Sequence, residues 1–209
     1  PCPPVYLQVL VGKWIEVDGW EVGKKDEVCS SLRELLTKTG ALMDECGIDW
    51  WVTGGTLLGV ERHATIPLAW DDDVDIAVSF ESRDYVFSDE FASKALSFGV
   101  DVFLLLANSK RRADRHGGVV RVQHYGGDNG GRYESLDIFF WKSRADGHIC
   151  KLDGWKGSGE VVENATETFR TEDVFPTRKV ECDGLSVRVP HRGRNLLTRQ
   201  YSERVWDSV

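Results

Sequence analysis

The sequence has few long apolar segments and a deficit of basic residues. No uninterrupted apolar run approaches the roughly 20 residues that a membrane-spanning helix needs, so we expect no membrane segment in this chain. Lys and Arg number 26 against 34 Asp and Glu, and the formal net charge is −8. A protein that coats nucleic acid by bulk charge needs a basic surface, so the composition argues against a nucleic-acid partner.

Internal repeats and low-complexity tracts are also lacking, and no linker divides the chain. The 209 residues are 41% hydrophobic and 29% charged, which is enough apolar material for a core. A length of this order fits one domain. We therefore expect a single domain over residues 1–209, with residues 1–25 as a possible N-terminal extension and the informative motifs within about 48–142.

No CxxC pair occurs among the five cysteines, so a zinc ribbon is not expected. Their spacing leaves free thiols and disulfides equally open. The start, Pro1-Cys2-Pro3-Pro4, does not resemble a signal peptide and has no initiator Met, so we expect a domain cut from a longer precursor. Asn164-Ala165-Thr166 is an N-glycosylation acceptor that matters only in a secreted chain, and the compartment stays open.

Hydrophobic periodicity predicts mixed helices and strands without a strict βαβ rhythm, which favours an α+β or mixed-sheet α/β domain. We expect helices at 26–46, 56–62, 88–98 and 194–206, strands at 48–52, 74–78, 100–107, 119–125 and 136–141, a hairpin at 177–189 and extended structure at 5–22. Residues 110–118 read as a basic loop, which either contacts an anionic ligand or is simply solvated.

The acidic run at residues 71–75 is the most informative segment. Asp71, Asp72, Asp73 and Asp75 fall within five positions and lead into an apolar strand. Side chains alternate along a strand, so Asp71, Asp73 and Asp75 share one face. Two such charges at 4 Å repel by about 4 kcal/mol near a protein surface. A Mg²⁺ or Mn²⁺ ion offsets this repulsion, because hard divalent ions prefer carboxylate oxygens; the alternative is a solvated acidic turn.

Asp137 is a second unusual carboxylate, because it lies in an otherwise nearly apolar strand, Leu136 to Trp141. Burying a carboxylate is unfavourable unless it is paired or bound to metal. Asp73, Asp75 and Asp137 form a plausible metal-binding triad if their strands are neighbours. The alternative is an aspartate bonded to backbone amides or to an arginine.

A glycine turn precedes the acidic strand. Gly54 and Gly55 let the backbone approach a ligand closely, and the helix that starts at Thr56 offers free N–H groups to an anion. Arg62 and His63 follow at the end of this helix and are candidates for phosphate contacts. An ordinary tight turn and two surface side chains are the alternatives.

Together these motifs resemble the LicD/fukutin-related family. The resemblance rests on Gly55-Thr56-Leu57-Leu58-Gly59, Arg62-His63, Ile66-Pro67 and Trp70 to Ile76, and extends through Leu136-Asp137-Ile138-Phe139 into the C-terminal part. Leu68-Ala69 stand between Pro67 and Trp70, where the family's usual pattern has Trp directly after Ile-Pro. The resemblance implies a nucleotidyltransferase-type mixed β-sheet flanked by helices.

The resemblance also implies an activity. Members transfer a phosphoalcohol, such as phosphocholine, ribitol phosphate or glycerol phosphate, from a CDP-activated donor to a glycan or glycoconjugate hydroxyl. Carried over to this sequence, Asp73 and Asp75 are expected as metal ligands, with Asp71 as a further candidate and Asp137 as ligand or base. A phosphate would be held by Gly54, Gly55 and Thr56 and braced by Arg62 and His63, and Trp70 would pack on a base or sugar or anchor its loop.

Three other interpretations stay open. A nucleotidyltransferase would move a nucleoside monophosphate with the same metal chemistry, a glycosyltransferase also uses a DxD motif, and a catalytically silent binding domain would keep only the fold. The sequence also leaves open which alcohol and acceptor are used and whether the chain is an oligomer.

Overall fold

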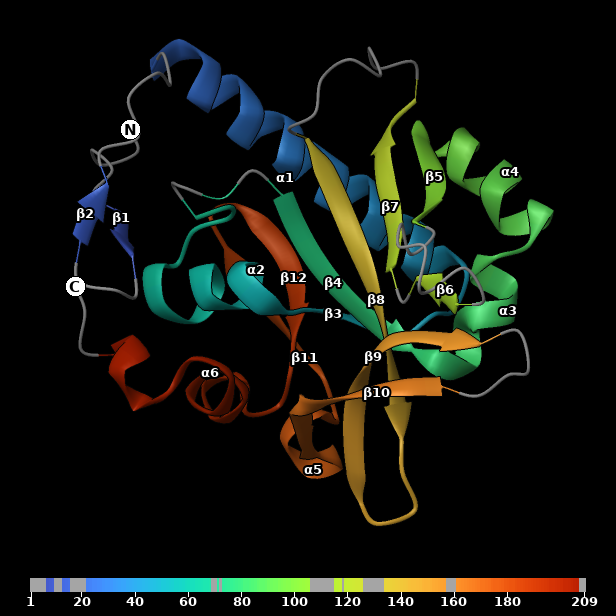
Figure 1. Ribbon diagram of the computed structural model, residues 1–209. Helices are drawn as coiled ribbons and strands as arrows, with labels where there is room; N and C mark the ends of the chain where they lie inside the picture. Colours follow the sequence, from blue (N-terminus) through green and yellow to red (C-terminus); the bar gives the residue numbers. More distant parts are fainter. Residues whose placement is uncertain are drawn as a thin grey trace.

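The computed structural model describes residues 7–9, 13–15, 22–68, 71, 73–105, 115–117, 119–125, 134–156 and 161–206. Within these ranges the protein is a mixed α/β domain whose principal sheet has helices on both sides (Figure 1). The fold prediction is confirmed in this respect. Trp70, Asp72 and most of the expected basic loop 110–118 lie outside the described residues, as does most of the expected N-terminal extension.

The principal sheet contains eight strands, with β10-β9-β8-β4-β3 as its main order, β5 and β7 continuing beside β8, and β6 beside β9. Two separate antiparallel ribbons are β1–β2 and β11–β12. The strands are β1 Leu7–Val9, β2 Lys13–Ile15, β3 Trp50–Val52, β4 Asp73–Ser79, β5 Val100–Leu105, β6 Arg115–Gly117, β7 Val119–His124, β8 Ser135–Ser143, β9 His148–Lys156, β10 Val161–Arg170, β11 Arg178–Cys182 and β12 Leu185–Val189.

Strand β8 is the centre of this sheet. One edge pairs in parallel with β4 over Ser135–Trp141. The other edge pairs antiparallel with β7 at residues 136–139 and then with β9 at residues 141–143. The first half of β8, which carries Asp137, therefore lies between β4 and β7.

The helices are α1 Val22–Glu45, α2 Gly54–Leu58, α3 Arg83–Val86, α4 Asp89–Ser97, α5 Thr171–Val174 and α6 Gly193–Tyr201, with the shorter η1 Gly59–His63, η2 Phe80–Ser82 and η3 Glu203–Trp206. Helix α1 crosses behind the sheet, with α3 and α4 near one end of it, and α2, α5 and α6 lie on the opposite side (Figure 1). No helix in the described ranges is long and apolar enough to span a membrane.

Helix α1 forms because its apolar residues recur at helical spacing and bury one stripe against the sheet. Leu32, Leu35 and Leu36 are fully or almost fully buried, as are Leu42 and Met43 one to two turns later. Burying side chains of this size contributes roughly 1.5–3 kcal/mol each. The predicted helix at 26–46 is therefore confirmed, and α1 begins a turn earlier than expected.

The strand and hairpin predictions are confirmed with small shifts. Strands β6, β9 and β10 and the short helices α3 and α5 were missed. β9 and β10 had no counterpart in the prediction. The apolar residues of β9 are interrupted by Lys151, Asp153 and Gly154, and β10 is mostly polar after Val162, so neither shows a regular apolar alternation. Within the expected basic loop, Arg115–Gly117 instead forms β6, which pairs with β9. The C-terminal helix breaks at Ser202, whose φ is 74°, so its predicted span is divided between α6 and η3.

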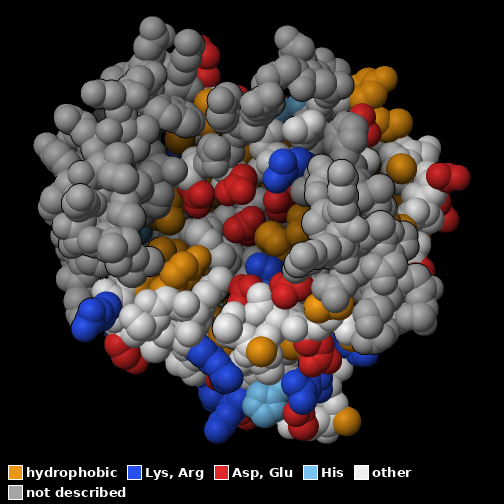
Figure 2. All heavy atoms as spheres, in the orientation of Figure 1, with side chains coloured by type: hydrophobic (Ala, Val, Ile, Leu, Met, Phe, Trp, Pro, Cys, Tyr) orange, Lys and Arg blue, Asp and Glu red, His pale blue; other side chains and the backbone are white. Residues whose placement is uncertain are grey.

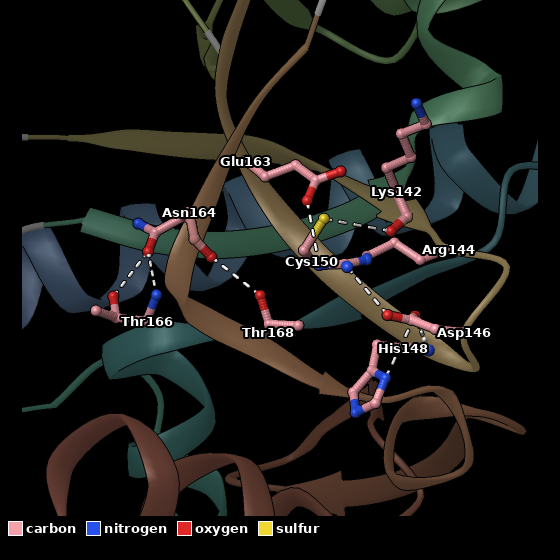
Figure 3. A network of polar contacts seen from close by, with 9 residues as sticks. All are labelled: Lys142, Arg144, Asp146, His148, Cys150, Glu163, Asn164, Thr166 and Thr168. Carbon is pink, nitrogen blue, oxygen red and sulfur yellow. Dashed lines mark hydrogen bonds and ion pairs between the residues drawn. The ribbon is translucent and has the colours of Figure 1, made fainter.

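The four described cysteines, Cys29, Cys46, Cys150 and Cys182, are free thiols. Cys150 lies on β9 among polar side chains at one end of the β8–β9–β10 meander (Figure 3). Burial is the main reason that its pKa is raised to about 11. It is therefore an un-ionised, structural thiol at neutral pH.

Candidate active site

Apolar and acidic residues alternate at the start of β4, so the strand has two chemically different faces. Val74, Ile76 and Val78 are completely buried, whereas Asp73 and Asp75 point to the other side and are partly accessible. The buried face packs toward α1. The strand therefore uses its apolar residues for the core and places Asp73 and Asp75 on the opposite face, which confirms the two faces predicted from the sequence. Their use as ligands stays a prediction.

The parallel pairing of β4 with β8 places Asp75 directly beside Asp137 as register partners. Neighbouring strands lie roughly 5 Å apart, and side chains at paired positions point to the same face. The condition on which the predicted triad depended, that the two strands be neighbours, is therefore met. Sequence distance hid this contact, because β4 and β8 are separated by more than fifty residues.

The Asp75 carboxylate is destabilised as an anion. Its pKa is raised to about 8, first by burial and then by the negative charges of Asp73, Asp137 and Asp71. Desolvation and like charges both disfavour ionisation of an acid. The four carboxylates thus form one electrostatic cluster, in which a positive charge beside Asp75 would be favourable.

Asp137 has a very different environment, because Arg121 holds both of its oxygens. Arg121 lies opposite Asp137 on β7, and its Nε and Nη2 donate to Oδ1 and Oδ2 at 2.8 and 2.9 Å. This bidentate geometry explains how a residue only 7% exposed carries a carboxylate. The alternative interpretation of Asp137 as an arginine-bonded aspartate is therefore observed, within the same carboxylate cluster.

The glycine turn is shaped by the two aspartates above it. Gly54 has φ +55°, and a Cβ there would lie 2.6 Å from Asp75 Oδ2. A Cβ on Gly55 would collide with Asp71 Oδ2. Both positions therefore require glycine, because a side chain would displace the carboxylates. The turn and the acidic residues are separate signals in the sequence, and the structure brings them together.

Thr56 joins this turn to β4. Its hydroxyl is buried and accepts a hydrogen bond of 2.8 Å from the Asp75 N–H, while the Thr53 N–H donates to the Asp75 carbonyl at 3.1 Å. The observed contact of Thr56 is thus with the strand that carries the carboxylate. Its use as a phosphate ligand stays a prediction.

Arg62 and His63 end η1, beyond the glycine turn. The pKa of His63 is lowered by partial desolvation and then by the positive charge of Arg62, so His63 is neutral near pH 7. Their proposed contacts with a phosphate stay predictions. Trp70 lies outside the described residues.

Three polar side chains near the aspartates were missed in the sequence. Lys151 on β9 acts electrostatically on Asp75, and Tyr201 at the end of α6 has its pKa raised to about 12 by burial, then by Asp75, Asp71 and Glu167. Glu167 on β10 binds Lys151 at 3.0 Å and Gln200 at 2.9 Å. β9 and β10 gave no strand signal in the sequence, so nothing marked these residues.

Figure 2 shows acidic side chains gathered in a hollow at the centre of one face, over the region where β4 and β8 run in Figure 1. Lys or Arg side chains lie at the border of this acidic group. Carboxylate oxygens are suitable ligands for Mg²⁺ or Mn²⁺. Among the described residues, however, no three His, Cys, Asp or Glu side chains form a group placed to hold a metal ion.

A protein-family model described as "LicD/FKTN/FKRP, nucleotidyltransferase domain" matches residues 47–192, well over half of the chain. The match includes the glycine turn, all four aspartates, Arg121 and the β9–β10 residues.

Two kinds of relative are similar in sequence. The uncharacterized protein RT0683 of Rickettsia typhi is 23% identical over 97% of this chain and 56% of its own length. Ribitol 5-phosphate transferase FKRP of Homo sapiens is 37% identical over 24% of this chain and 10% of its own length. The chain thus spans about half, or much less, of the curated relatives it matches.

Two solved structures align with this chain at TM-scores below 0.5. The lincosamide antibiotic adenylyltransferase LnuA in its lincomycin-bound form aligns at a TM-score of 0.43 and 14% identity, over 84% of this chain and 96% of its own. The antibiotic-resistance factor ANT(2'')-Ia aligns at 0.44 and 15%, over 78% and 66%.

Proposed function

The chain belongs to the LicD/FKTN/FKRP family, and from that premise we propose that it is a metal-dependent phosphoalcohol transferase. The donor is a CDP-activated alcohol, and the acceptor is a hydroxyl of a glycan or glycoconjugate. The relative FKRP, by its name a ribitol 5-phosphate transferase, supports a polyol phosphate as the transferred group. The observation that carries the proposal is the register pairing of Asp75 with Asp137, which concentrates carboxylates beside a glycine turn.

The carboxylate chemistry of the cluster supports a hard divalent cation as cofactor, although no three of the described side chains are grouped to hold one in this arrangement. The pKa of Asp75 is raised to about 8 by burial and by its three acidic neighbours, so its ionised form would be stabilised by a cation. Asp71, Asp73 and Asp75 would hold Mg²⁺ or Mn²⁺, with Asp137 as a further ligand. When bound, the ion would neutralise charge on the donor diphosphate and on the transferring phosphoryl group.

The chain's own residues would position the reactants. The acceptor hydroxyl attacks the phosphorus of the phosphoalcohol, the bond from that phosphorus to the bridging oxygen breaks, and CMP leaves with the bond electrons. The hydroxyl proton must pass to a base, and Asp137 is the candidate, because Arg121 fixes its orientation. The backbone of Gly54 and Gly55 would let the diphosphate approach without a side chain in the way.

A donor screen tests the proposal. CDP-choline, CDP-ribitol, CDP-glycerol and CDP-ethanolamine are each incubated with the protein and Mg²⁺ or Mn²⁺, and CMP release and thermal stabilisation are measured. We expect one donor to release CMP in a metal-dependent reaction, and EDTA to stop it. Asp73→Asn should stop CMP release, while Asp84→Asn on α3 should not, because Asp84 is exposed and pairs with Arg83.

The same assay separates the alternatives. Pyrophosphate release from CTP or another nucleoside triphosphate, without CMP release from any CDP-alcohol, would identify a nucleotidyltransferase. Release of a nucleoside diphosphate from a nucleotide sugar would identify a glycosyltransferase. Binding of nucleotide with no product in any assay would identify a silent binding domain.

A further inference from the structure

Lys151 and Glu167, which the sequence did not mark, form an ion pair at the border of the acidic cluster. Lys151 lies opposite Trp141 in the β8–β9 ladder. Because side chains alternate, it shares a face with Phe139 and Asp137. Its ammonium lies 3.9 Å from the centre of the Phe139 ring, which confirms that direction. Lys151 therefore points to the same side of the sheet as the carboxylates.

Glu167 holds the lysine from the next strand. It is 9% exposed, and both of its oxygens are bonded. Oε1 accepts from Gln200 at 2.9 Å, and Oε2 accepts from Lys151 at 3.0 Å and from Asn164 at 3.2 Å. Donors from β9, β10 and α6 thus converge on one carboxylate, which fixes the position of the ammonium group.

Asn164, the possible glycosylation acceptor, belongs to the hydrogen-bond network around Glu167. Its Oδ1 accepts from the Thr166 hydroxyl at 2.7 Å and its carbonyl accepts from Thr168 at 3.1 Å (Figure 3). The Asn164 Nδ2 donates to Asp153 and Glu167. The tripeptide therefore forms a turn that carries Glu167 toward Lys151, and its amide nitrogen is already engaged within the protein.

The charges around Lys151 suggest what this residue could bind. The guanidinium group of Arg121 already donates hydrogen bonds to both carboxylate oxygens of Asp137 and offsets its charge. The other three aspartates of the cluster repel an anionic diphosphate, and one divalent ion offsets only two of their three charges. Lys151 is bonded to one carboxylate and covered on one side by Phe139, yet its three N–H groups can serve a further acceptor. Its side chain is 19% exposed, so Lys151 is not sealed inside the core.

We propose that Lys151, braced by Glu167, is a substrate-binding residue that contacts a phosphate oxygen of a nucleoside diphosphate donor. The proposal rests on the proposed function for the identity of the donor, but the contact itself requires only a nucleoside diphosphate and a divalent ion. Lys151 supplies the positive charge on the side of the phosphate facing β9. Glu167 is a positioning residue, because it acts through Lys151.

Calorimetric titration of CDP in the presence of Mn²⁺ tests this contact directly. Lys151→Met keeps the chain length and removes the charge, and we expect it to weaken CDP binding at least tenfold while cytidine binding is unchanged. Lys151→Arg should recover part of the loss. Lys142→Met is the matched control, because Lys142 lies 5.9 Å above the Phe80 ring and should bind CDP as the wild type does.

Titration of Mn²⁺ without CDP tests whether Lys151 binds the phosphate directly or only supports the structure of the site. Lys151→Met should bind Mn²⁺ at least as well as the wild type, because it loses a positive charge near Asp75. Equal CDP affinity in wild type and Lys151→Met would overturn the proposal, and so would a loss of Mn²⁺ binding or no CDP binding by the wild type. If Lys151 governs CDP binding but no CDP-alcohol releases CMP, the phosphate contact stands and the proposed transfer falls.

Discussion

Asp75 and Asp137 are the same residue type at paired positions of neighbouring strands, yet their surroundings differ in almost every respect. Asp137 is buried and receives two hydrogen bonds from Arg121. Asp75 has three acidic neighbours, and none of the hydrogen bonds found in the described part of the chain reaches its carboxylate. Asp137 is paired with an arginine, whereas the charges around Asp75 are mostly negative, with Lys151 as the cation that acts on it among the described residues.

The difference shows that one sheet can hold two neighbouring carboxylates in opposite electrostatic environments. A buried charge that is paired within the fold destabilises the free protein little, but a bound cation then adds less stabilisation to it. A charge held without a partner destabilises the free protein and makes ion binding more favourable. The raised pKa of Asp75 reflects this second arrangement.

Removing the Asp75 carboxylate should have the largest effect. We expect Asp75→Ala to reduce CMP release by about a thousandfold or more, since metal-centred charge stabilisation contributes several kcal/mol to a phosphoryl transfer. Asp84→Ala is the control, since Asp84 is an exposed residue of α3. Full metal-dependent turnover by Asp75→Ala, measured as initial rates under saturating Mn²⁺, would contradict the assignment.

Releasing Asp137 from its arginine should have a smaller effect. Arg121→Met leaves a buried carboxylate without its bidentate partner, and we expect a roughly 10- to 100-fold loss of turnover from misorientation of the base. Arg121→Lys should recover part of the lost turnover, because lysine keeps the positive charge but cannot make the bidentate hydrogen bonds of the guanidinium group. If Arg121→Met folds, as shown by circular dichroism, and keeps full turnover, the pair has no role in positioning.

The smallest effect is on stability, and it depends on pH. Because the folded pKa of Asp75 is raised to about 8 from 3.8, the folded protein keeps a proton that the unfolded chain has lost. Without metal, stability should therefore fall as pH rises from about 4 to about 8 and then level off. Asp75→Asn should remove this slope and stabilise the EDTA-treated protein by about 1–3 kcal/mol near pH 8. Urea titrations at pH 5 and 8.5 measure it, and a wild type equally stable at both values would argue against a destabilised Asp75.

The sequence was most informative where local alternation decides the outcome. Asp73, Val74, Asp75 and Ile76 alternate in chemistry, so the two faces of this strand could be predicted from the sequence alone. A polar residue in an apolar strand marked Asp137 in the same way. Arg121 carries a matching signal, because it lies among valines at 119, 120 and 122.

The remaining site residues could not be predicted, because their roles depend on register and long-range packing. The pairing of Arg121 with Asp137 requires knowing how β7 lies beside β8. Lys151 and Glu167 lie on strands whose polar sequences resemble loops, and they meet across an irregular stretch of the β9–β10 ladder. Tyr201 reaches the cluster only because α6 returns over the sheet face.

The two hydrogen bonds that Thr53 and Thr56 make with the backbone of Asp75 have a dynamic consequence. Thr53 and Thr56 hold the main chain of Asp75 from both sides, so the turn cannot open while the strand stays in place. Turn and strand therefore form one cooperative unit in local unfolding. Any movement that admits or releases a ligand must come from elements around this unit, and the unit itself serves as the fixed reference against which they move.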